Sequence, residues 1–189
     1  MAQSQPMIDV DKQLLIRIGR GDECALAKLY EKYAAMVFSF VVTRTPDRML
    51  AEEIAADVWL GCWRSAPAFR GDSRVLTWLL GIAKRQIYVH TRRKFLPQIS
   101  LDESEYEIAA EENDLADLVV SGAQAKKLLI ALRQLPDDVT EIVRLAWVYE
   151  LPYGEIAKLT GIPIRTVKSR VYRARRLLHE QLRSNDDWV

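Results

Sequence analysis

One stretch near the C-terminus decides the fold, YGEIAKLTGIPIRTVKSRVYRARR over Tyr153–Arg176. Its spacing predicts a short helix over Tyr153–Thr160 and a tight turn at Gly161-Ile162, since glycine permits backbone angles that other residues avoid. A second helix is predicted over Pro163–Leu182, because proline is favoured at the first position of a helix. Two helices joined in this way have the spacing of a helix-turn-helix.

The second of these helices divides into an apolar side and a basic side. At about 100° per residue, one side collects the apolar residues Ile164, Val167, Val171, Ala174, Leu178 and Leu182. A neighbouring face carries Arg165, Lys168, Tyr172 and Arg176, with Ser169 and Arg173 at its edge. Such a helix can pack its apolar side on a bundle and offer its polar groups to a DNA major groove. A helix that is merely solvated would carry similar charges, but the Gly161 turn and the preceding short helix favour DNA.

Helical periodicity extends through most of the chain. Three apolar stripes predict three helices around one core, namely Leu26, Leu29, Tyr30, Tyr33, Val37, Phe40 and Val41, then Ile54, Ala55, Val58, Trp59 and Cys62, then Leu76, Leu79, Ile82, Ala83 and Ile87. A second bundle begins with Leu128, Leu129, Leu132 and Leu135 and continues after Pro136 with Val139, Ile142, Val143 and Ala146. No alternating pattern is long enough for a sheet. The fold class is therefore predicted to be all-α.

Composition limits the class of protein. The 189 residues are 49% apolar and 28% charged, which is the usage of a globular chain and not of a disordered one. The longest apolar run without a charge, Tyr33–Thr43, is much shorter than the roughly 18 residues of a spanning helix. The N-terminus lacks the basic start and apolar stretch of an export signal, so a cytoplasmic protein is expected. Cys24 and Cys62 have no metal-ligand spacing and are expected to be buried thiols, without a metal or cofactor.

The net charge of +1 conceals a strong segregation of charge along the chain. Ser73–Phe95 holds six basic residues and no acidic ones, and Leu96–Gln124 holds eight acidic residues and no Lys or Arg. Ile162–Ser184 holds seven basic residues against Glu180 alone. Two basic blocks around an acidic connector are typical of two nucleic-acid contacts joined by a tether. Three ordinary solvated faces would give the same counts, and charge alone favours that simpler interpretation.

The first basic block differs from the second because aromatic residues are interleaved with the cations. Phe69, Trp78 and Tyr88 stand among Arg70, Arg74, Lys84, Arg85, Arg92 and Arg93. Flat rings for stacking and cations for phosphates are what single-stranded nucleic acid requires. The loop Ala68–Ser73 is centred on a glycine beside an aromatic ring, so it could form a pocket for an extruded base. For Trp78, packing in the core is an equally good interpretation.

Several motifs carry a family resemblance that covers residues 12–183. They are Ala51-Glu52-Glu53-Ile54 with Asp57-Val58-Trp59, Phe69-Arg70-Gly71-Asp72-Ser73 followed by Thr77-Trp78-Leu79, Leu135-Pro136 with Gly161-Ile162-Pro163, and Thr166-Val167-Lys168-Ser169-Arg170 with Arg173-Ala174-Arg175. Together and in this order, they resemble the group IV, or extracytoplasmic-function (ECF), sigma factors of bacterial RNA polymerase. Several motifs in the right order are far more specific than any one of them.

The resemblance implies two small helical domains joined by an acidic linker. Residues 1–95 would correspond to sigma region 2, which binds core polymerase and recognises and melts the minus-ten element. Residues 125–189 would correspond to region 4, which recognises the minus-thirty-five element and touches the β flap. The linker, 96–124, is either a simple tether or a polyanion placed in the polymerase cleft. The resemblance also implies a protein that is not an enzyme, and an inhibitory anti-sigma partner of a kind that is often membrane-anchored.

The same resemblance implies roles for individual residues. The minus-ten contacts would be Phe69, Arg70, Gly71, Asp72, Ser73, Trp78, Lys84, Arg85, Tyr88, Arg92 and Arg93. The minus-thirty-five contacts would be Arg165, Thr166, Lys168, Ser169, Tyr172, Arg173 and Arg176. Docking on the β′ clamp helices of the polymerase would use Glu52, Glu53, Asp57, Val58 and Trp59.

The chain also departs from the family pattern. It has Ala56 and Trp59 where members usually carry glutamine and phenylalanine, which would shift or weaken the clamp contact. Pro152 stands where a serine commonly caps the first helix of the helix-turn-helix, and Gly154 follows within its first turn. A missing cap costs ~1 kcal/mol and a helical glycine about as much, so this helix should depend on tertiary packing.

Two other functions fit parts of the sequence. A stand-alone helix-turn-helix regulator would need only the C-terminal half and would usually bind a palindrome as a dimer, so the first domain argues against it. An enzyme is disfavoured because His90 and His179 lie in helical basic segments with no convergent nucleophile or metal-ligand set.

Overall fold

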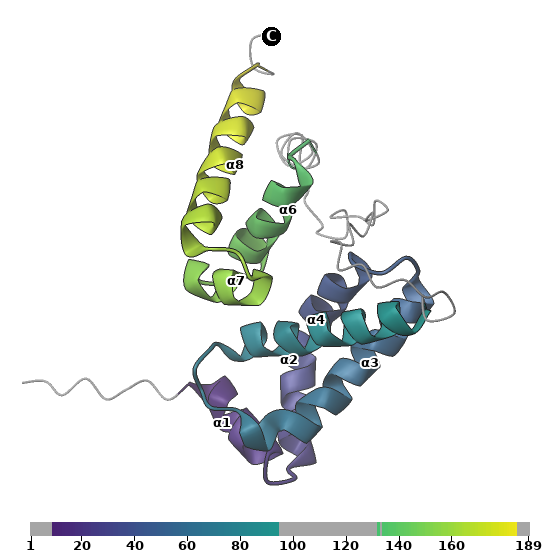
Figure 1. Ribbon diagram of the computed structural model, residues 1–189. Helices are drawn as coiled ribbons and strands as arrows, with labels where there is room; N and C mark the ends of the chain where they lie inside the picture. The colour runs from purple at the N-terminus through teal and green to yellow at the C-terminus, as the bar shows by residue number, and fades with distance from the viewer. Residues whose placement is uncertain (1–8, 95–131, 133, 185–189) are drawn as a thin grey trace, which may run out of the picture. The chain divides into compact units, whose positions relative to one another are not determined.

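The computed structural model describes residues 9–94, 132 and 134–184 of the chain. Every regular element in these residues is a helix and none is a strand, which confirms the predicted all-α class (Figure 1). The chain divides into two compact units, Met1–Asn113 and Asp114–Val189. The predicted acidic linker, 96–124, and the predicted core residues Leu128 and Leu129 lie outside the described residues.

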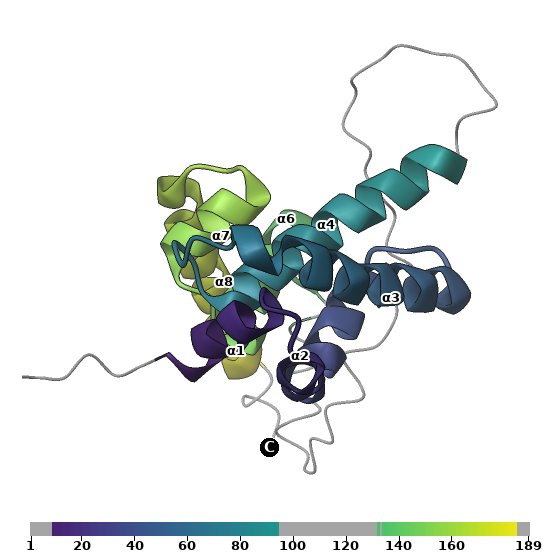
Figure 2. The same ribbon diagram turned by 90° about the horizontal axis from the view of Figure 1, so that it is seen from below.

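The first unit is a helical bundle. It contains α1 (Val10–Ile18), α2 (Glu23–Val42), α3 (Arg48–Ser65), the single turn η1 (Ala66–Ala68) and α4 (Val75–Lys94). Helices α2, α3 and α4 pack against one another, as their three apolar stripes predict (Figure 1 and Figure 2). Their shared core includes the fully buried side chains Leu29, Val37, Ile54, Leu79 and Leu80. None of the helices that the structure describes is both long enough and apolar enough to span a bilayer.

Aspartate caps set where three helices of this unit begin. Asp9, Asp22 and Asp47 stand directly before α1, α2 and α3, and each accepts a hydrogen bond from a backbone N–H of the first turn. The shortest of these bonds, from the N–H of Leu50 to Asp47, is 2.7 Å long. Each cap satisfies an amide that has no partner within its helix, and the loss of such a cap costs about 1 kcal/mol.

The sequence did not predict α1, and it misplaced two residues of α2. Helix α1 is short, and its three buried residues, Leu14, Leu15 and Ile18, are too few to stand out as a stripe. Tyr30 is 51% exposed and Cys24 is exposed, so the expectation that both are buried is wrong. Cys62 is buried as expected, and burial raises the pKa of its thiol to about 12.

The second unit is built around the predicted helix-turn-helix. It contains α6 (Asp137–Val143), the π-helical turn η3 (Arg144–Val148), α7 (Tyr153–Thr160) and α8 (Ile164–Ser184). The core joins α6 to α8 through Leu135, Val139, Val143, Ala174 and Leu178, with Leu132 and Leu177 packed against them. Helix α7 has the predicted bounds, and Gly161 follows it with a φ of +82°, which confirms the tight turn. The fold therefore places α8 with one side on the core and the other toward solvent.

Packing holds α7 in place, as the missing cap predicts. Pro152 occupies the N-cap position and makes no side-chain hydrogen bond, while Ile156 and Leu159 of α7 are buried. The first turn of α8 differs from expectation, because Ile164 is 46% exposed although it belongs to the predicted apolar side. Ile164 lies beside Gly154 of α7, which has no side chain to cover it.

Two glycines of the helix-turn-helix should respond in opposite ways to alanine. Gly161→Ala puts a Cβ into open space but forces a residue other than glycine to a φ of +82°, so we expect the free energy of unfolding to fall by about 1 kcal/mol. Gly154→Ala adds only an ordinary contact with Ile164, so helix propensity should raise stability by about 0.5–1 kcal/mol. Urea denaturation followed by circular dichroism measures both changes. The same sign for both would contradict this backbone geometry.

Candidate nucleic-acid and partner interfaces

Helix α4 presents a basic and aromatic stripe to solvent. Lys84, Arg85, Tyr88 and Arg92 are exposed and recur at steps of one to four residues, which places them on one side of the helix; we call them the α4 stripe. Tyr88 is 61% exposed, and the Arg92 guanidinium donates a hydrogen bond of 3.2 Å to its hydroxyl. Gly81, one turn earlier, leaves the backbone uncovered. The stripe combines cations with a flat ring, which is the chemistry that single-stranded nucleic acid binds.

The loop between η1 and α4 brings Phe69 and Trp78 into contact. Their ring centroids lie 5.2 Å apart with planes inclined by 61°, which is an edge-to-face pair. Gly71 at the centre of the loop has a φ of +79°, and its carbonyl accepts a hydrogen bond of 2.7 Å from Lys12 Nζ. The other predicted loop residues, Arg70 and Asp72, are exposed, and Ser73 is half-buried. The loop is therefore held at the Phe69 ring and at the Gly71 carbonyl, and polar side chains lie around these two points.

Helix α3 separates the residues that the family resemblance placed on one docking face. Glu52 and Glu53 are exposed, and Asp57 is partly exposed. Val58 is fully buried and Trp59 is only 9% exposed, so neither lies on that face. The reason is helical rotation, since a residue five positions after Glu53 lies about 140° around the axis from it. Trp59 packs on Tyr30 of α2 with ring centroids 5.0 Å apart.

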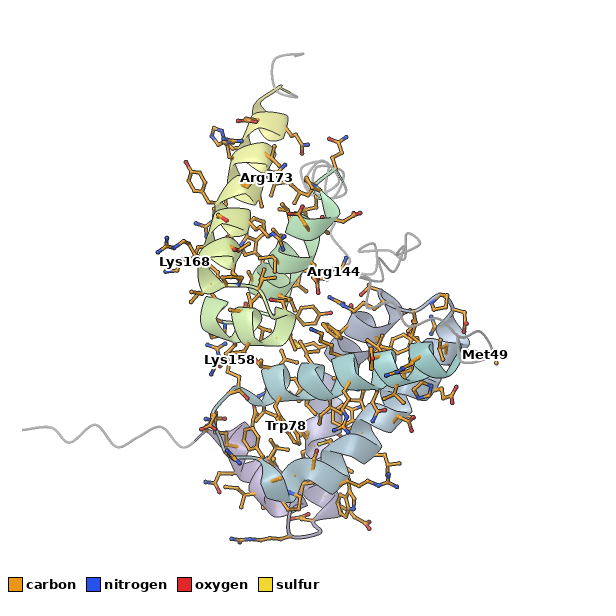
Figure 3. The ribbon with its side chains drawn as sticks, in the orientation of Figure 1. Met49, Trp78, Arg144, Lys158, Lys168 and Arg173 are labelled. Carbon is orange, nitrogen blue, oxygen red and sulfur yellow. The ribbon has the colours of Figure 1, made fainter. Side chains whose placement is uncertain are left out.

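The outer side of α3 carries Met49 and Leu60, which the sequence did not indicate as site residues, beside Ala56. Met49 is 82% exposed, Leu60 is 44% exposed and Ala56 is exposed; Figure 3 shows Met49 projecting from the N-terminal end of α3. With Glu53 they follow the helical steps of four, three and four residues, so all four lie on one side. We call Met49, Glu53, Ala56 and Leu60 the α3 face. That spacing was readable in the sequence once the rotation of the helix was known.

His90 of α4 joins that helix to the carboxylates of α3. Its Nε2 lies 2.8 Å from the Asp57 carboxylate and its Nδ1 lies 3.8 Å from Glu53, while its side chain is only 10% exposed. Nothing in the sequence indicates this contact, because 33 positions separate His90 from Asp57. Among the residues that the structure describes, no group of three or more His, Cys, Asp and Glu side chains could hold a metal ion.

Helix α8 exposes most of the residues predicted to touch duplex DNA. Arg165, Lys168, Ser169, Tyr172, Arg173 and Arg176 are exposed, and Thr166 is half-buried. Lys168 projects from the side of α8 that faces away from α6 (Figure 3). Two arginines have carboxylate partners: Arg170 contacts Asp138 of α6 at 3.2 Å, and Arg176 lies 3.7 Å from Glu180. The exposed face of α8 carries the kinds of side chain that can hydrogen-bond to base edges and phosphates in a major groove.

Comparisons with known proteins identify the family. Residues 29–94 match Sigma-70 region 2, and residues 125–178 match Sigma-70, region 4. The chain is 28% identical over 184 residues to the ECF RNA polymerase sigma-E factor of Escherichia coli (strain K12), covering 91% of this chain and 94% of that one. It is 27% identical over 180 residues to the RNA polymerase sigma-H factor of Pseudomonas aeruginosa, covering 91% and 93%. The chain belongs to the ECF group of the sigma-70 family.

Solved structures have the same fold as this sigma factor. CnrH, in complex with the cytosolic domain of CnrY, aligns with a TM-score of 0.60 and 17% identity over 93% of this chain and 99% of that one. The sigma factor RpoE of Bartonella quintana, in complex with the anti-sigma factor NepR, aligns with a TM-score of 0.54 and 22% identity, covering 83% and 96%. Both units match sigma-70 regions, so the chain is a sigma factor and not a stand-alone regulator.

The two matched ranges include the candidate interfaces but exclude helix α1. The region 2 match includes the α3 face, the loop at Gly71 and the α4 stripe, and the region 4 match includes α6, α7 and most of α8. Helix α1 lies outside both ranges, and so does Lys12. The side chain of Arg93, a predicted minus-ten residue, lies outside the described residues.

The contact between His90 and Asp57 should stabilise the first unit. His90→Ala removes a buried partner from a carboxylate, so we expect the free energy of unfolding to fall by about 1–3 kcal/mol. The matched variant Glu53→Gln alters only the longer contact of an exposed side chain and should cost less than about 0.5 kcal/mol. Urea denaturation of the purified sigma factor measures both. Equal losses would show that the 2.8 Å contact has no special weight.

Proposed function

We propose that this sigma factor binds core RNA polymerase and directs it to promoters through two DNA contacts, one on each unit. The observation that carries the proposal is that one sigma-70 chain pairs the α4 stripe with the exposed basic face of α8. Residues 1–95 are the polymerase-binding and minus-ten domain, 96–124 the acidic linker, and 125–189 the minus-thirty-five domain. The chain acts as a specificity subunit, and the polymerase performs the chemistry.

In the minus-ten contact, the loop Phe69–Ser73 takes an unstacked base and the α4 stripe holds the phosphates of the same strand. Extruding a base costs a few kcal/mol, which contacts in the pocket must offset. The Phe69 ring is already held by Trp78, so little ordering is needed when the base arrives. Arg70 and Asp72 offer exposed polar groups to the edges of the base. Arg93 is a further minus-ten contact that the resemblance implies.

In the minus-thirty-five contact, α8 lies in the major groove. Lys168, Ser169 and Tyr172 touch base edges, and Arg173 holds phosphate together with the predicted contacts Arg165, Thr166 and Arg176. The Ser169 hydroxyl donates to the carbonyl of Thr166 at 2.9 Å, so its oxygen remains an acceptor for a base amine. The ion pair of Arg176 with Glu180 is exposed and worth at most about 1 kcal/mol, so phosphate can replace it at little cost.

The polymerase contact is made by the α3 face, with Glu52 and Asp57 at its edge. An apolar centre of Met49, Ala56 and Leu60 with a charged rim is the usual composition of a protein interface. Val58 and Trp59 support this face from within the core. The second unit adds the contact with the β flap.

The family resemblance adds an inhibitory partner and a location. An anti-sigma factor, itself soluble or anchored in a membrane, would cover the polymerase-binding surfaces until a stress or envelope signal releases the sigma factor. The sigma factor acts in the cytoplasm, where the polymerase and its promoters are found. The comparison with the Bartonella quintana factor, which was solved with an anti-sigma factor, is consistent with such a partner.

Run-off transcription tests the proposed function directly. The purified chain is added to core polymerase on a pool of genomic fragments, and transcripts are sequenced at their starts. We expect a small set of discrete starts that depend on the added chain and share two sequence elements upstream. No chain-dependent transcript from any fragment, with a known sigma factor active in parallel, would refute the proposal.

The recognition helix should separate base contacts from phosphate contacts. Lys168→Ala should relax sequence preference and weaken specific binding by about 1–3 kcal/mol, because it removes a base contact. Arg173→Ala should weaken all sequences alike and reduce the salt slope by about one, because it removes a phosphate contact. Fluorescence anisotropy on promoter and random duplexes at several salt concentrations measures both. Equal behaviour of the two variants would contradict the assigned roles.

The α3 face should govern affinity for core polymerase. Leu60→Asp puts a charge in the centre of the interface, so we expect core affinity to fall about tenfold, or about 1.4 kcal/mol. Glu53→Lys should weaken binding less, because it lies nearer the rim. Glu31→Lys, exposed on α2, makes the same charge change outside the α3 face and is the matched control. Co-purification at graded core concentrations measures affinity, and unchanged binding by Leu60→Asp would place the interface elsewhere.

A further inference from the structure

A lysine reaches from α1 to the loop between η1 and α4. Lys12 Nζ donates a hydrogen bond of 2.7 Å to the carbonyl of Gly71, across 59 positions of sequence and in a part-buried setting. A charged donor makes a stronger bond than a neutral one. Gly71 has a φ of +79°, which other residues rarely adopt, so the glycine sets the direction of its carbonyl and the lysine holds it there.

A second contact joins the other end of α1 to η1. Gly19 follows α1 directly, and a Cβ placed on it would lie 3.2 Å from both the Cα and the N of Pro67. That approach is tighter than a side chain normally allows, so the backbone at the end of α1 rests directly on η1. Helix α1 therefore contacts the segment Ala66–Ser73 twice, first at Pro67 and again at Gly71.

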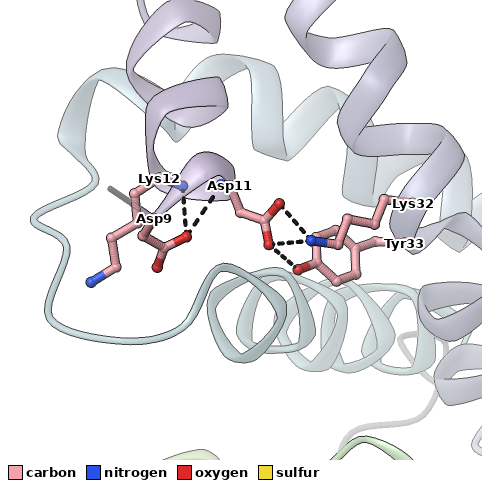
Figure 4. A network of polar contacts seen from close by, with 5 residues as sticks. All are labelled: Asp9, Asp11, Lys12, Lys32 and Tyr33. Carbon is pink, nitrogen blue, oxygen red and sulfur yellow. Dashed lines mark hydrogen bonds and ion pairs between the residues drawn. The ribbon is translucent and has the colours of Figure 1, made fainter. Parts of the chain in front are cut away.

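Helix α1 is itself fixed to α2 by the polar network in Figure 4. The Asp11 carboxylate accepts hydrogen bonds from Lys32 Nζ at 2.6 and 2.7 Å and from the Tyr33 hydroxyl at 2.5 Å. Burial and the neighbouring Asp11 raise the pKa of Tyr33 well above its usual range, so the hydroxyl keeps its proton and remains a donor. Asp9 caps the helix at the N–H of Asp11 and Lys12. The Lys12 side chain points away from Lys32 and Tyr33, which leaves its amine for the loop.

We propose that α1 holds the loop Phe69–Ser73 in the geometry that captures an unstacked DNA base, with Lys12 as the positioning residue of the loop. We call this support of the loop by α1 the splint. The inference rests on the minus-ten role of that loop proposed above. Contacts at Pro67, Gly71 and the Phe69 ring restrict the loop before DNA binds, so less conformational freedom is lost when the base enters. The family match begins at residue 29, so the role of α1 does not follow from it.

A lysine near DNA can also bind phosphate, and the two roles differ in what they require of the template. A phosphate contact is indifferent to the base and lowers the salt slope by about one when it is removed. Holding the loop affects promoter opening only where a base is captured. The effect of removing Lys12 should therefore disappear when that base is missing from the template. Templates that carry an abasic site at single positions therefore separate the two roles.

The test uses the full chain with core polymerase on a promoter found by run-off transcription. Permanganate footprinting follows the rate of promoter opening on intact duplex and on templates with one abasic site in the melted region. Removing the captured base should slow opening by the wild-type protein. The same removal should not change the rate of opening by Phe69→Ala, and this difference identifies the captured position.

Lys12→Met should slow opening about tenfold on the intact template, since the loop is no longer held in the geometry of capture, and leave the rate on the abasic template unchanged. Lys28→Met removes the same charge from the exposed side of α2 and should change neither rate. In the background of Phe69→Ala, Lys12→Met should add little, because both changes act on the same pocket. Should Lys12→Met fail to fold by circular dichroism, Gly19→Ala, which pushes α1 away from Pro67, should show the same dependence on the template.

Four results would overturn the splint. Equal slowing on both templates would make Lys12 a phosphate contact, and additive losses with Phe69→Ala would place its effect outside the loop. If Phe69→Ala slows opening but neither Lys12→Met nor Gly19→Ala does, the splint fails while the minus-ten loop stands. If Phe69→Ala opens the promoter like the wild type, the proposed loop function fails and the splint fails with it.

Discussion

Helix α4 can offer one side to DNA because its other side is locked into the core of the first unit. Leu79, Leu80 and Ala83 are fully buried in it. Turning α4 by one position, about 100°, would carry Lys84 toward the core, where an unpaired charge is very costly. The rotation of the helix is thus fixed by burial of its apolar side and by the cost of burying Lys84. The exposure of the α4 stripe depends on that rotation, and so does the contact of His90 with Asp57 across the boundary with α3.

The surfaces proposed for two different partners share this one small core. The α3 face lies on a helix that packs directly against α4, and His90 joins the two helices across their boundary. A change that loosens the packing would therefore disturb the surfaces for polymerase and for DNA together. Substitutions confined to exposed positions, such as Leu60 or Tyr88, are the ones that can separate the two activities.

The sequence predicts the helices well where a long apolar stripe sets the period, as in α2, α3, α4 and α8. It fails at distant contacts, and the family resemblance fails where it disagrees with the apolar stripe. A motif match placed Trp59 on a docking face, although the period of α3 turns it into the core. The sequence did not predict helix α1, because this helix is short and has few buried residues. The bond between Lys12 and Gly71 joins residues 59 positions apart, and only the folded chain brings them together.

The two cysteines of the first unit provide a chemical handle that needs no mutagenesis. Cys24 stands in the first turn of α2 with its side chain in solvent, whereas Cys62 is enclosed in the core with a thiol pKa of about 12. Thiol reagents attack the thiolate form of an accessible sulfur, so they will distinguish sharply between the two. A maleimide dye should therefore attach at Cys24 alone in the native protein. That position belongs to none of the proposed interfaces, which makes it suitable for following this chain as it joins and leaves the polymerase.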